Sequence, residues 1–300
     1  MNLPRLAFVI LAASGLARLA SAEDKPQLSP SGYVEIWPGT LPIVLSAPHG
    51  GTAKPASIPD RAYGKTNLDG FTRPIAYAMR AALTKKFGQA PPLVVCLLSR
   101  RKVDCNREIK EATQGNPVAE KVWREFQDGI EAAEKAMLAK HKKGLYFDVH
   151  AQGNPGSRVE LGYALTAEEL GWPDEKLNAP DVAARSTLRS LDQASPATFA
   201  ELIRGPLSFG ALLQQRGIRA TPSPALPLKA GDLYFAGGYN VRTHGSADGK
   251  GLDAIQLETP ITVRKTPEDR ETFARAVADA TAEYLLKHRG WKLAEARSAE

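Results

Sequence analysis

The segment from Pro42 to Thr52, with the sequence PIVLSAPHGGT, organises the rest of the chain. Pro42 to Leu45 is a short apolar run whose β-branched residues are typical of a strand buried on both faces of a parallel or mixed sheet. A proline and two glycines follow, so we expect His49 on a tight loop beyond the carboxyl end of this strand. Ligands of α/β sheets bind at that edge, which makes His49 a candidate functional residue.

Two later apolar segments end in polar groups in the same way. Leu145 to Val149 leads into His150, and Ala254 to Leu257 leads into Glu258. Because loops at one sheet edge converge in space, we expect these side chains to meet. Two imidazole nitrogens and a carboxylate oxygen form the donor set of a catalytic zinc site, which leaves a fourth position for water. The chain contains no HExxH or CxxC pattern, so such a site must be assembled from separate strands.

Predicted strands and helices alternate along the chain. Further strands are expected at Pro92 to Ser99 and Gly156 to Leu165, with helices from Thr66 or Asn67 to Phe87, Pro117 to Lys142, Asp181 to Leu191, Leu207 to Arg216, and Thr266 or Pro267 to about Gly290. The segments 221–227 and 234–239 are expected to be loops. This alternation predicts a single α/β domain over residues 23–300, built as three αβα layers around a mixed, mainly parallel sheet.

The first 22 residues have the features of an export signal. Arg5 precedes an apolar run from Leu6 to Leu16, and Ala20-Ser21-Ala22 forms the small-x-small pattern of a cleavage site. The alternative, an uncleaved anchor, is disfavoured because the run is short for a bilayer. We therefore expect a periplasmic or secreted protein with no stable membrane insertion after cleavage of the signal.

Charge and cysteine content narrow the classes of partner. The 39 basic and 33 acidic side chains give a formal net charge of +6, and the basic residues are scattered, which argues against nucleic-acid binding. The two cysteines leave two states open. Cys96 lies in an apolar run where a buried free thiol is expected, and an oxidising compartment would permit a bridge to Cys105.

Five short motifs, taken together, resemble those of a known family. In chain order they are SAPHGG at 46–51, VDCNR at 103–107, FDVHAQG at 147–153, GGYNVRTHG at 237–245 and AIQLE at 254–258. The set resembles the N-formylglutamate amidohydrolase family, whose fold is similar to that of zinc carboxypeptidases and aspartoacylase-type amidohydrolases. The resemblance extends from Pro42 to the final helix, so it implies a zinc carboxypeptidase-like fold for most of the chain.

The resemblance implies that His49 and His150 are ligands of one zinc ion per chain, although another divalent metal would also fit. Zinc carboxypeptidases place a glutamate three residues after the first ligand, and Thr52 stands there in this chain. Asp69 is the first candidate for the third ligand because the family has an acidic residue there, and Asp60 is the second. The alternative for Asp69 is a carboxylate that stabilises the start of a helix.

The resemblance also indicates supporting and substrate-binding residues. Asp148 would support His150 as a neighbouring carboxylate, or through the backbone turn if strand alternation points it away from that ring. Asn106 and Arg107 resemble the pair that holds a substrate carboxylate, since a guanidinium group can meet it with two parallel hydrogen bonds. The alternative for Arg107 is a surface ion pair. Asp104 is expected to organise its loop.

Glu258 matches the catalytic glutamate of the zinc carboxypeptidase fold, which serves as general base and then as general acid. Its alternative is a salt bridge at a strand end. Arg242 and His244 are expected to bind a second carboxylate or to stabilise an oxyanion, with a solvated loop as the alternative.

These predictions describe a zinc-dependent hydrolase of an amide bond in a small acidic substrate, such as an N-formyl or N-acyl amino acid. The alternatives are a secreted carboxypeptidase or murein-peptide amidase, and an inactive carboxylate-binding protein of the same fold.

Overall fold

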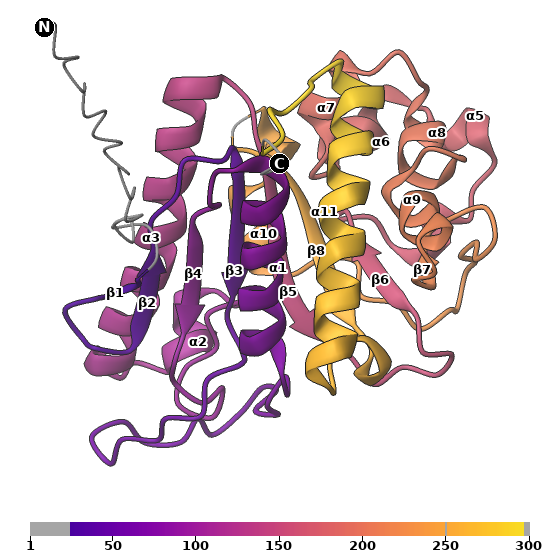
Figure 1. Ribbon diagram of the computed structural model, residues 1–300. Coiled ribbons are helices and arrows are strands. Elements are labelled where there is room, and N and C mark those ends of the chain that lie inside the picture. The colour runs from indigo at the N-terminus through magenta and orange to yellow at the C-terminus, as the bar shows by residue number, and fades with distance from the viewer. Residues whose placement is uncertain (1–24, 250, 297–300) are drawn as a thin grey trace, which may run out of the picture.

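A computed structural model describes residues 25–249 and 251–296, and a single sheet runs through them (Figure 1). The sheet has eight strands in the order β1-β2-β4-β3-β5-β8-β6-β7. Their bounds are β1 (Gln27–Leu28), β2 (Val34–Trp37), β3 (Ile43–Ala47), β4 (Leu93–Cys96), β5 (Leu145–Ala151), β6 (Val159–Gly162), β7 (Ala220–Thr221) and β8 (Asp253–Thr259). The predicted export signal lies outside the described residues.

The centre of the sheet is parallel and its flanks are mixed. Strands β4, β3, β5 and β8 are neighbours and run parallel. Strand β2 pairs antiparallel with β4, and β6 pairs antiparallel with β8. The prediction of an α/β fold with a mixed, mainly parallel sheet is therefore confirmed, and the carboxyl ends of the central strands share one edge.

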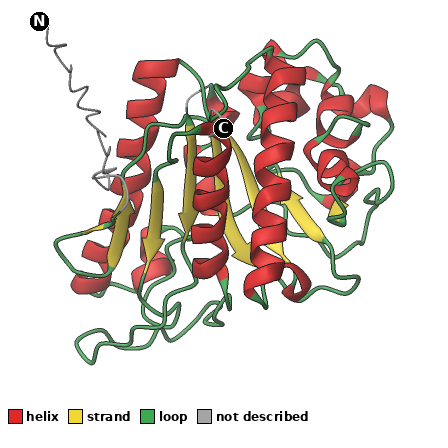
Figure 2. Cartoon of the chain, viewed as in Figure 1, coloured by secondary structure: helices red, strands yellow, loops and turns green. Residues whose placement is uncertain are grey.

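Helices cover both faces of the sheet, as Figures 1 and 2 show. Helices α1 (Thr72–Phe87) and α11 (Pro267–Arg289) cover the front face, whereas α2 (Ile109–Thr113), α3 (Pro117–His141) and α10 (Tyr239–His244) cover the back. The remaining helices are α4 (Ala167–Leu170), α5 (Asp174–Leu177), α6 (Pro180–Arg185), α7 (Arg189–Ala194), α8 (Phe199–Arg204), α9 (Phe209–Gln215), and the 3₁₀ turns η2 (Ser246–Asp248) and η3 (Ile261–Val263).

Side-chain alternation along the central strands builds two cores. Leu45 of β3 and Phe147 of β5 are buried in the core that includes α1 and α11. Val44 and Tyr146, one position earlier on each strand, are buried in the core that includes α3. Successive residues of a strand point to opposite faces, so apolar residues at consecutive positions serve both layers.

The two long helices follow their sequence signals closely. The Asn116 side chain accepts hydrogen bonds from the first turn of α3, and Pro117 occupies the first helical position. Thr266 and Asp269 form a capping box at the start of α11. Among the described residues, no helix has the length and apolar character needed to cross a membrane.

Some of the predicted elements differ from those in the structure. Helix α1 begins at Thr72 rather than at Thr66 or Asn67, because Phe71 adopts a left-handed conformation that interrupts the helix. The helix predicted over 181–191 is divided into α6 and α7 by Ser186, whose backbone is extended. The loop predicted over 234–239 ends at Gly238, because Tyr239 begins α10, a helix that was not predicted. Strands β1, β2 and β7 were also not predicted.

The loop after β3 can pass close to its neighbours only because it contains glycine. A Cβ atom at Gly51 would lie 2.3 Å from the backbone carbonyl carbon of Leu97, and one at Gly50 would lie 2.7 Å from the backbone nitrogen of Arg73. Backbone atoms on both sides of His49 therefore fix the path of this loop.

We predict that Gly51→Ala lowers the free energy of unfolding by about 3 kcal/mol, because the added methyl group must displace backbone. Urea denaturation measures the change. Gly70→Ala is the matched control, because a Cβ atom there has nothing within 4 Å. Equal stability of the two variants would contradict this account of the loop.

Candidate functional site

Three connections at the carboxyl edge of the sheet bring the predicted ligands together. His150 is the last but one residue of β5, and its register partner on the parallel strand β8 is Glu258. His49 lies on the loop after β3, and Asp69 precedes α1. The parallel register therefore places His150 and Glu258 side by side on one face of the sheet.

Asp69 is held in place by its own backbone. Its N–H donates to the carbonyl of His49 at 3.3 Å. The Thr72 hydroxyl donates to the Asp69 carbonyl at 2.8 Å, at the point where α1 begins. The Asp69 side chain, which is 8% exposed, is thereby directed away from α1 and toward the two histidines.

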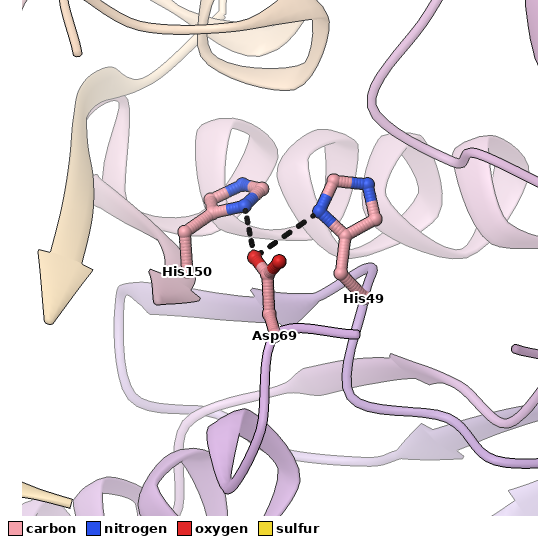
Figure 3. Close-up of side chains that lie close together, drawn as sticks. All are labelled: His49, Asp69 and His150. Carbon is pink, nitrogen blue, oxygen red and sulfur yellow. Dashed lines mark hydrogen bonds and ion pairs between the residues drawn. The ribbon is translucent and has the colours of Figure 1, made fainter. Parts of the chain in front are cut away.

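His49, Asp69 and His150 form a compact buried group (Figure 3). Oδ2 of Asp69 lies 3.3 Å from Nδ1 of His49 and 3.3 Å from Nδ1 of His150. One donor atom from each residue lies within 4.8 Å of the others. Two imidazole nitrogens and one carboxylate oxygen in this arrangement could hold a divalent metal ion.

The far nitrogen of each ring contacts a further buried carboxylate. Nε2 of His49 lies 2.6 Å from Oδ1 of Asp104, and Nε2 of His150 lies 2.8 Å from Oδ2 of Asp148. Nδ2 of Asn106 also lies 3.1 Å from Nε2 of His150, but the shorter contact is to a carboxylate, which only accepts. Each Nε2 therefore carries hydrogen, and each Nδ1 offers its lone pair to the metal position when the ring is neutral. Both the tautomers of the two histidine rings and the spacing of the three donor atoms therefore suit the binding of a metal ion.

The contact of Asp148 decides between the two predicted modes of support. Its carboxylate meets the ring of His150 directly. The idea that strand alternation turns Asp148 away was wrong, because residues two positions apart lie on the same face of a strand. Asp104, predicted to organise its loop, also accepts from the Asn106 backbone at 3.1 Å, in addition to its contact with His49.

Charges within this group perturb one another. Burial works to raise the pKa of Asp69, but the imidazole groups of His49 and His150 outweigh it and hold that pKa below its usual range. Burial works to lower the pKa of His150, but the Asp148 carboxylate raises it well above its usual value. A metal ion would bind the neutral ring, so metal binding would compete with protonation of His150.

Asp60, the second candidate for the third ligand, lies elsewhere. Its side chain is half exposed, and its carboxylate pairs with Lys102 at 2.9 Å and Arg101 at 3.6 Å. Asp69 instead pairs with Arg100, whose Nη1 lies 3.5 Å from Oδ1. The structure thus brings Asp69 to the histidines and leaves Asp60 at the surface.

Glu258 lies beside the metal position and is almost fully buried. Burial raises its pKa to about 8, and the neighbouring His150 partly offsets this effect. Nε2 of Gln256 donates to Oε1 of Glu258 at 2.9 Å, and Oε1 of Gln256 accepts from the Gly238 N–H at 2.6 Å. A glutamate whose pKa is near neutrality can both accept and donate a proton.

A cavity of about 400 Å³ opens above these residues. Its floor includes the two histidines, Asp69 and Glu258. The other lining residues are Lys65, Asn67, Arg100, Asn106, Arg107, Ala151, Gln152, Gly153, Phe235, Ala236, Gly237, Gly238 and Gln256. Three of these side chains, Lys65, Arg100 and Arg107, are cationic. The cavity therefore has carboxylates on its floor and positive charges on its walls, which favour an anionic ligand.

Asn106 and Arg107, the pair predicted to hold a substrate carboxylate, both line this cavity. Nη1 of Arg107 donates to the Asn106 carbonyl at 2.7 Å, and Nε lies 3.4 Å from Glu111. Oδ1 of Asn106 accepts from the Asn240 N–H at 2.8 Å, which fixes its amide beside His150. Asn106 therefore has a role in the protein framework in addition to its exposure to the cavity.

Arg242 and His244 lie outside the residues that line the cavity. Arg242 is exposed and donates to the carbonyl of Gly237 at 3.3 Å. His244 is buried on the back face, between Glu134 and Gln127. The structure therefore does not bring His244 to the place where an oxyanion would form.

Sequence reasoning missed several groups in the cavity. Lys65, Arg100 and Gln256 were not singled out, because nothing in their local sequence marks them as facing a site.

The sequence left open whether Cys96 and Cys105 form a disulfide bond. In this structure both cysteines are free and buried.

Comparisons with known proteins give structural neighbours. No family model matches the chain, and no curated protein matches it. Several solved structures are similar to it, among them the following two. The N-formylglutamate amidohydrolase from Ralstonia eutropha JMP134 has 14% sequence identity and a TM-score of 0.46, over 84% of this chain and 96% of that chain. The gene product Atu2144 from Agrobacterium tumefaciens has 13% identity and a TM-score of 0.48, over 88% and 95%.

The first neighbour carries the family name that the five motifs predicted. At these identities and TM-scores, neither neighbour assigns an activity to this chain.

The raised pKa of Glu258 predicts a pH dependence of stability in the metal-free protein. Between its ordinary pKa of 4.5 and the folded value of about 8, the folded state holds a proton that the unfolded chain releases. Stability therefore falls as pH rises through this window. Glu258→Gln removes this effect. From pH 5 to pH 8, the free energy of unfolding of wild type should therefore fall by on the order of 3 kcal/mol more than that of the variant.

Denaturation of chelator-treated protein at the two pH values measures this difference. Glu175→Gln, an exposed site on α5, is the control and should show the wild-type pH dependence. A parallel pH dependence of Glu258→Gln and wild type would show that Glu258 is not held protonated.

Proposed function

We propose that this chain is a metal-dependent amidohydrolase of the N-formylglutamate amidohydrolase type, with zinc as its metal and a zinc carboxypeptidase-like fold. The observation that carries the proposal is the buried group of His49, Asp69 and His150 next to Glu258 on the floor of a polar cavity. The five sequence motifs support it, since they contain every residue of this group except Asp69.

Each residue has a distinct part in the proposed reaction. A bound zinc ion supplies Lewis acidity, which activates water and polarises an acyl oxygen. His49, Asp69 and His150 would hold it. Glu258 accepts the proton of the attacking water and passes it to the nitrogen of the leaving amine. The hydrogen bond from Gln256 to Oε1 orients the carboxyl group and leaves Oε2 for this transfer.

The walls of the cavity support a small acidic substrate. Lys65, Arg100 and Arg107 give the lining three positive side chains. Arg100 is paired with Asp69 and Asp104, whereas Arg107 is partly exposed beside Asn106. We assign the substrate carboxylate to Arg107 and Asn106, and the substrate to the N-formyl or N-acyl amino acids, whose cleaved bond is a non-peptide carbon–nitrogen bond.

The position of Asp69 bears on the alternative of an inactive binding protein. That alternative drew on Thr52, which stands where zinc carboxypeptidases have a glutamate ligand. Asp69 provides a carboxylate at the histidines from another part of the chain. An active enzyme therefore accounts for the donor set better than a binding protein does. We further propose that it acts in the periplasm or outside the cell.

We predict that purified wild-type protein binds about one zinc ion per chain and that Asp69→Asn, His49→Ala and His150→Ala each lose it, because three donors are needed to hold the ion. Elemental analysis after dialysis measures the metal content. Asp60→Asn is the matched control, since it makes the same change at the other candidate ligand, which lies at the surface. Loss of metal in that variant, or retention in Asp69→Asn, would contradict the ligand assignment.

We predict that Glu258→Gln reduces turnover of N-acyl amino acids by at least about 100-fold, the usual contribution of a general base, and leaves the zinc content unchanged. Release of the free amino acid from a panel of N-formyl, N-acetyl and longer N-acyl substrates measures the rate. Activity on peptides alone would favour the carboxypeptidase alternative. Full turnover in the variant would refute the role of Glu258.

A further inference from the structure

A chain of hydrogen bonds runs from the candidate metal centre through the back layer to His244. Nδ2 of Asn240 donates to Oδ2 of Asp148 at 3.1 Å. Nε2 of Gln127 donates to Oδ1 of Asn240 at 3.1 Å, and Oε1 of Gln127 lies 2.9 Å from Nε2 of His244. The chain therefore connects β5, α10 and α3, which are far apart in the sequence.

The direction of each hydrogen bond is fixed. Nε2 of Gln127 also donates to the Cys105 carbonyl at 2.9 Å, so the amide nitrogen has two acceptors and its oxygen must face His244. Nε2 of His244 consequently donates. Its Nδ1 lies 3.1 Å from Oε2 of Glu134 on α3. Every donor in the chain thus points from His244 toward Asp148.

The residues that form this chain of hydrogen bonds are buried, so reversing the direction of its donors costs free energy. Asp148 and Asn240 are fully buried, and Gln127 and His244 are less than one-tenth exposed. A buried polar group that loses its partner costs about 1–3 kcal/mol. Reversal of one amide would leave two such groups facing the wrong partner, so the network has a single favourable arrangement.

Helix α10 contacts the site at a second point. The N–H of Gly238, which precedes α10, donates to Gln256, and Gln256 donates to Glu258. A Cβ atom at Gly238 would lie 2.3 Å from Nδ2 of Asn106, so the start of α10 fits directly against the side chain beside His150. His244 is the last residue of this helix and attaches its other end to α3.

We propose that His244 is a positioning residue of the metal centre. Through Gln127 and Asn240 it holds the Asp148 carboxylate as the acceptor of the Nε2 hydrogen of His150, which keeps Nδ1 of His150 directed at the metal. The inference rests on the proposed metal site and gives His244 a role that does not require contact with substrate. Residues that orient metal ligands in this way typically change metal affinity when replaced.

Gln127→Glu tests the inference with almost no change of shape. A carboxylate cannot donate to Asn240 or to the Cys105 carbonyl, so the direction of the chain is lost while the volume is kept. We expect the zinc dissociation constant, measured by competition with a chelator, to rise about tenfold, at the low end of the effect of residues that contact a ligand directly. His244→Asn takes the Nε2 donor away from Gln127 because the shorter side chain does not reach it, and it should act in the same direction.

His141→Asn is the matched control. It makes the same substitution near the end of α3, at a partly buried histidine beside Trp291 and outside the chain of hydrogen bonds. Its zinc affinity should equal that of wild type. The double variant Gln127→Glu/His244→Asn distinguishes an effect that passes through the hydrogen bonds from a general loss of packing. If both residues act through one network, the double variant loses less zinc affinity than the sum of the two single losses.

The outcomes are distinct. Raised dissociation constants in both single variants with a non-additive double variant support the role of His244. Unchanged affinity in Gln127→Glu, with the metal-free protein folded by circular dichroism, overturns it and leaves the proposed hydrolase standing. Additive effects that match the loss of thermal stability also overturn it, since they indicate packing alone. A wild-type protein that binds no zinc overturns both proposals.

Discussion

Three buried carboxylates share two imidazole rings at the centre of this protein. Asp69 lies between the rings, and Asp104 and Asp148 lie behind them. Carboxylates buried to this extent must be paired or must bind a cation, because an isolated buried charge is too costly. This requirement explains why segments from β3, β5, the loop before α1 and the loop after β4 all converge at one edge of the sheet.

Hydrogen bonds from the surrounding framework help to fix these side chains. Asn106 connects the Asp104 loop to α10, and Gln256 connects α10 to Glu258. Arg264 donates to the carbonyls of Thr259, Gly70 and Gln152, so it joins three loops of the site edge. The resulting cavity has a rigid polar floor, which is the arrangement that preorganised chemistry requires.

The fold and much of the site could be predicted from local patterns. The strands that lead to His49 or contain His150 and Glu258 are apolar runs that end in glycine or polar residues, and α3 and α11 have clear capping signals. Other features have no local signature. Phe71 has a left-handed backbone conformation, so α1 begins only at Thr72. The short antiparallel strands β1 and β2 form by pairing with the edge of the sheet at β4, which lies far from them in the sequence.

The sequence by itself determined the α/β architecture and made the two histidines and Glu258 candidates, because each lies at the end of a strand, or just after one, whose composition is visible in consecutive residues. Only the tertiary structure showed that Asp69 lies beside the two histidines and Asp60 does not, that the Asp148 carboxylate contacts the ring of His150, and that His244 lies in the back layer. The physical reason is that these assignments depend on which charges share a buried space. That is set by strand register and helix packing between residues far apart in the chain.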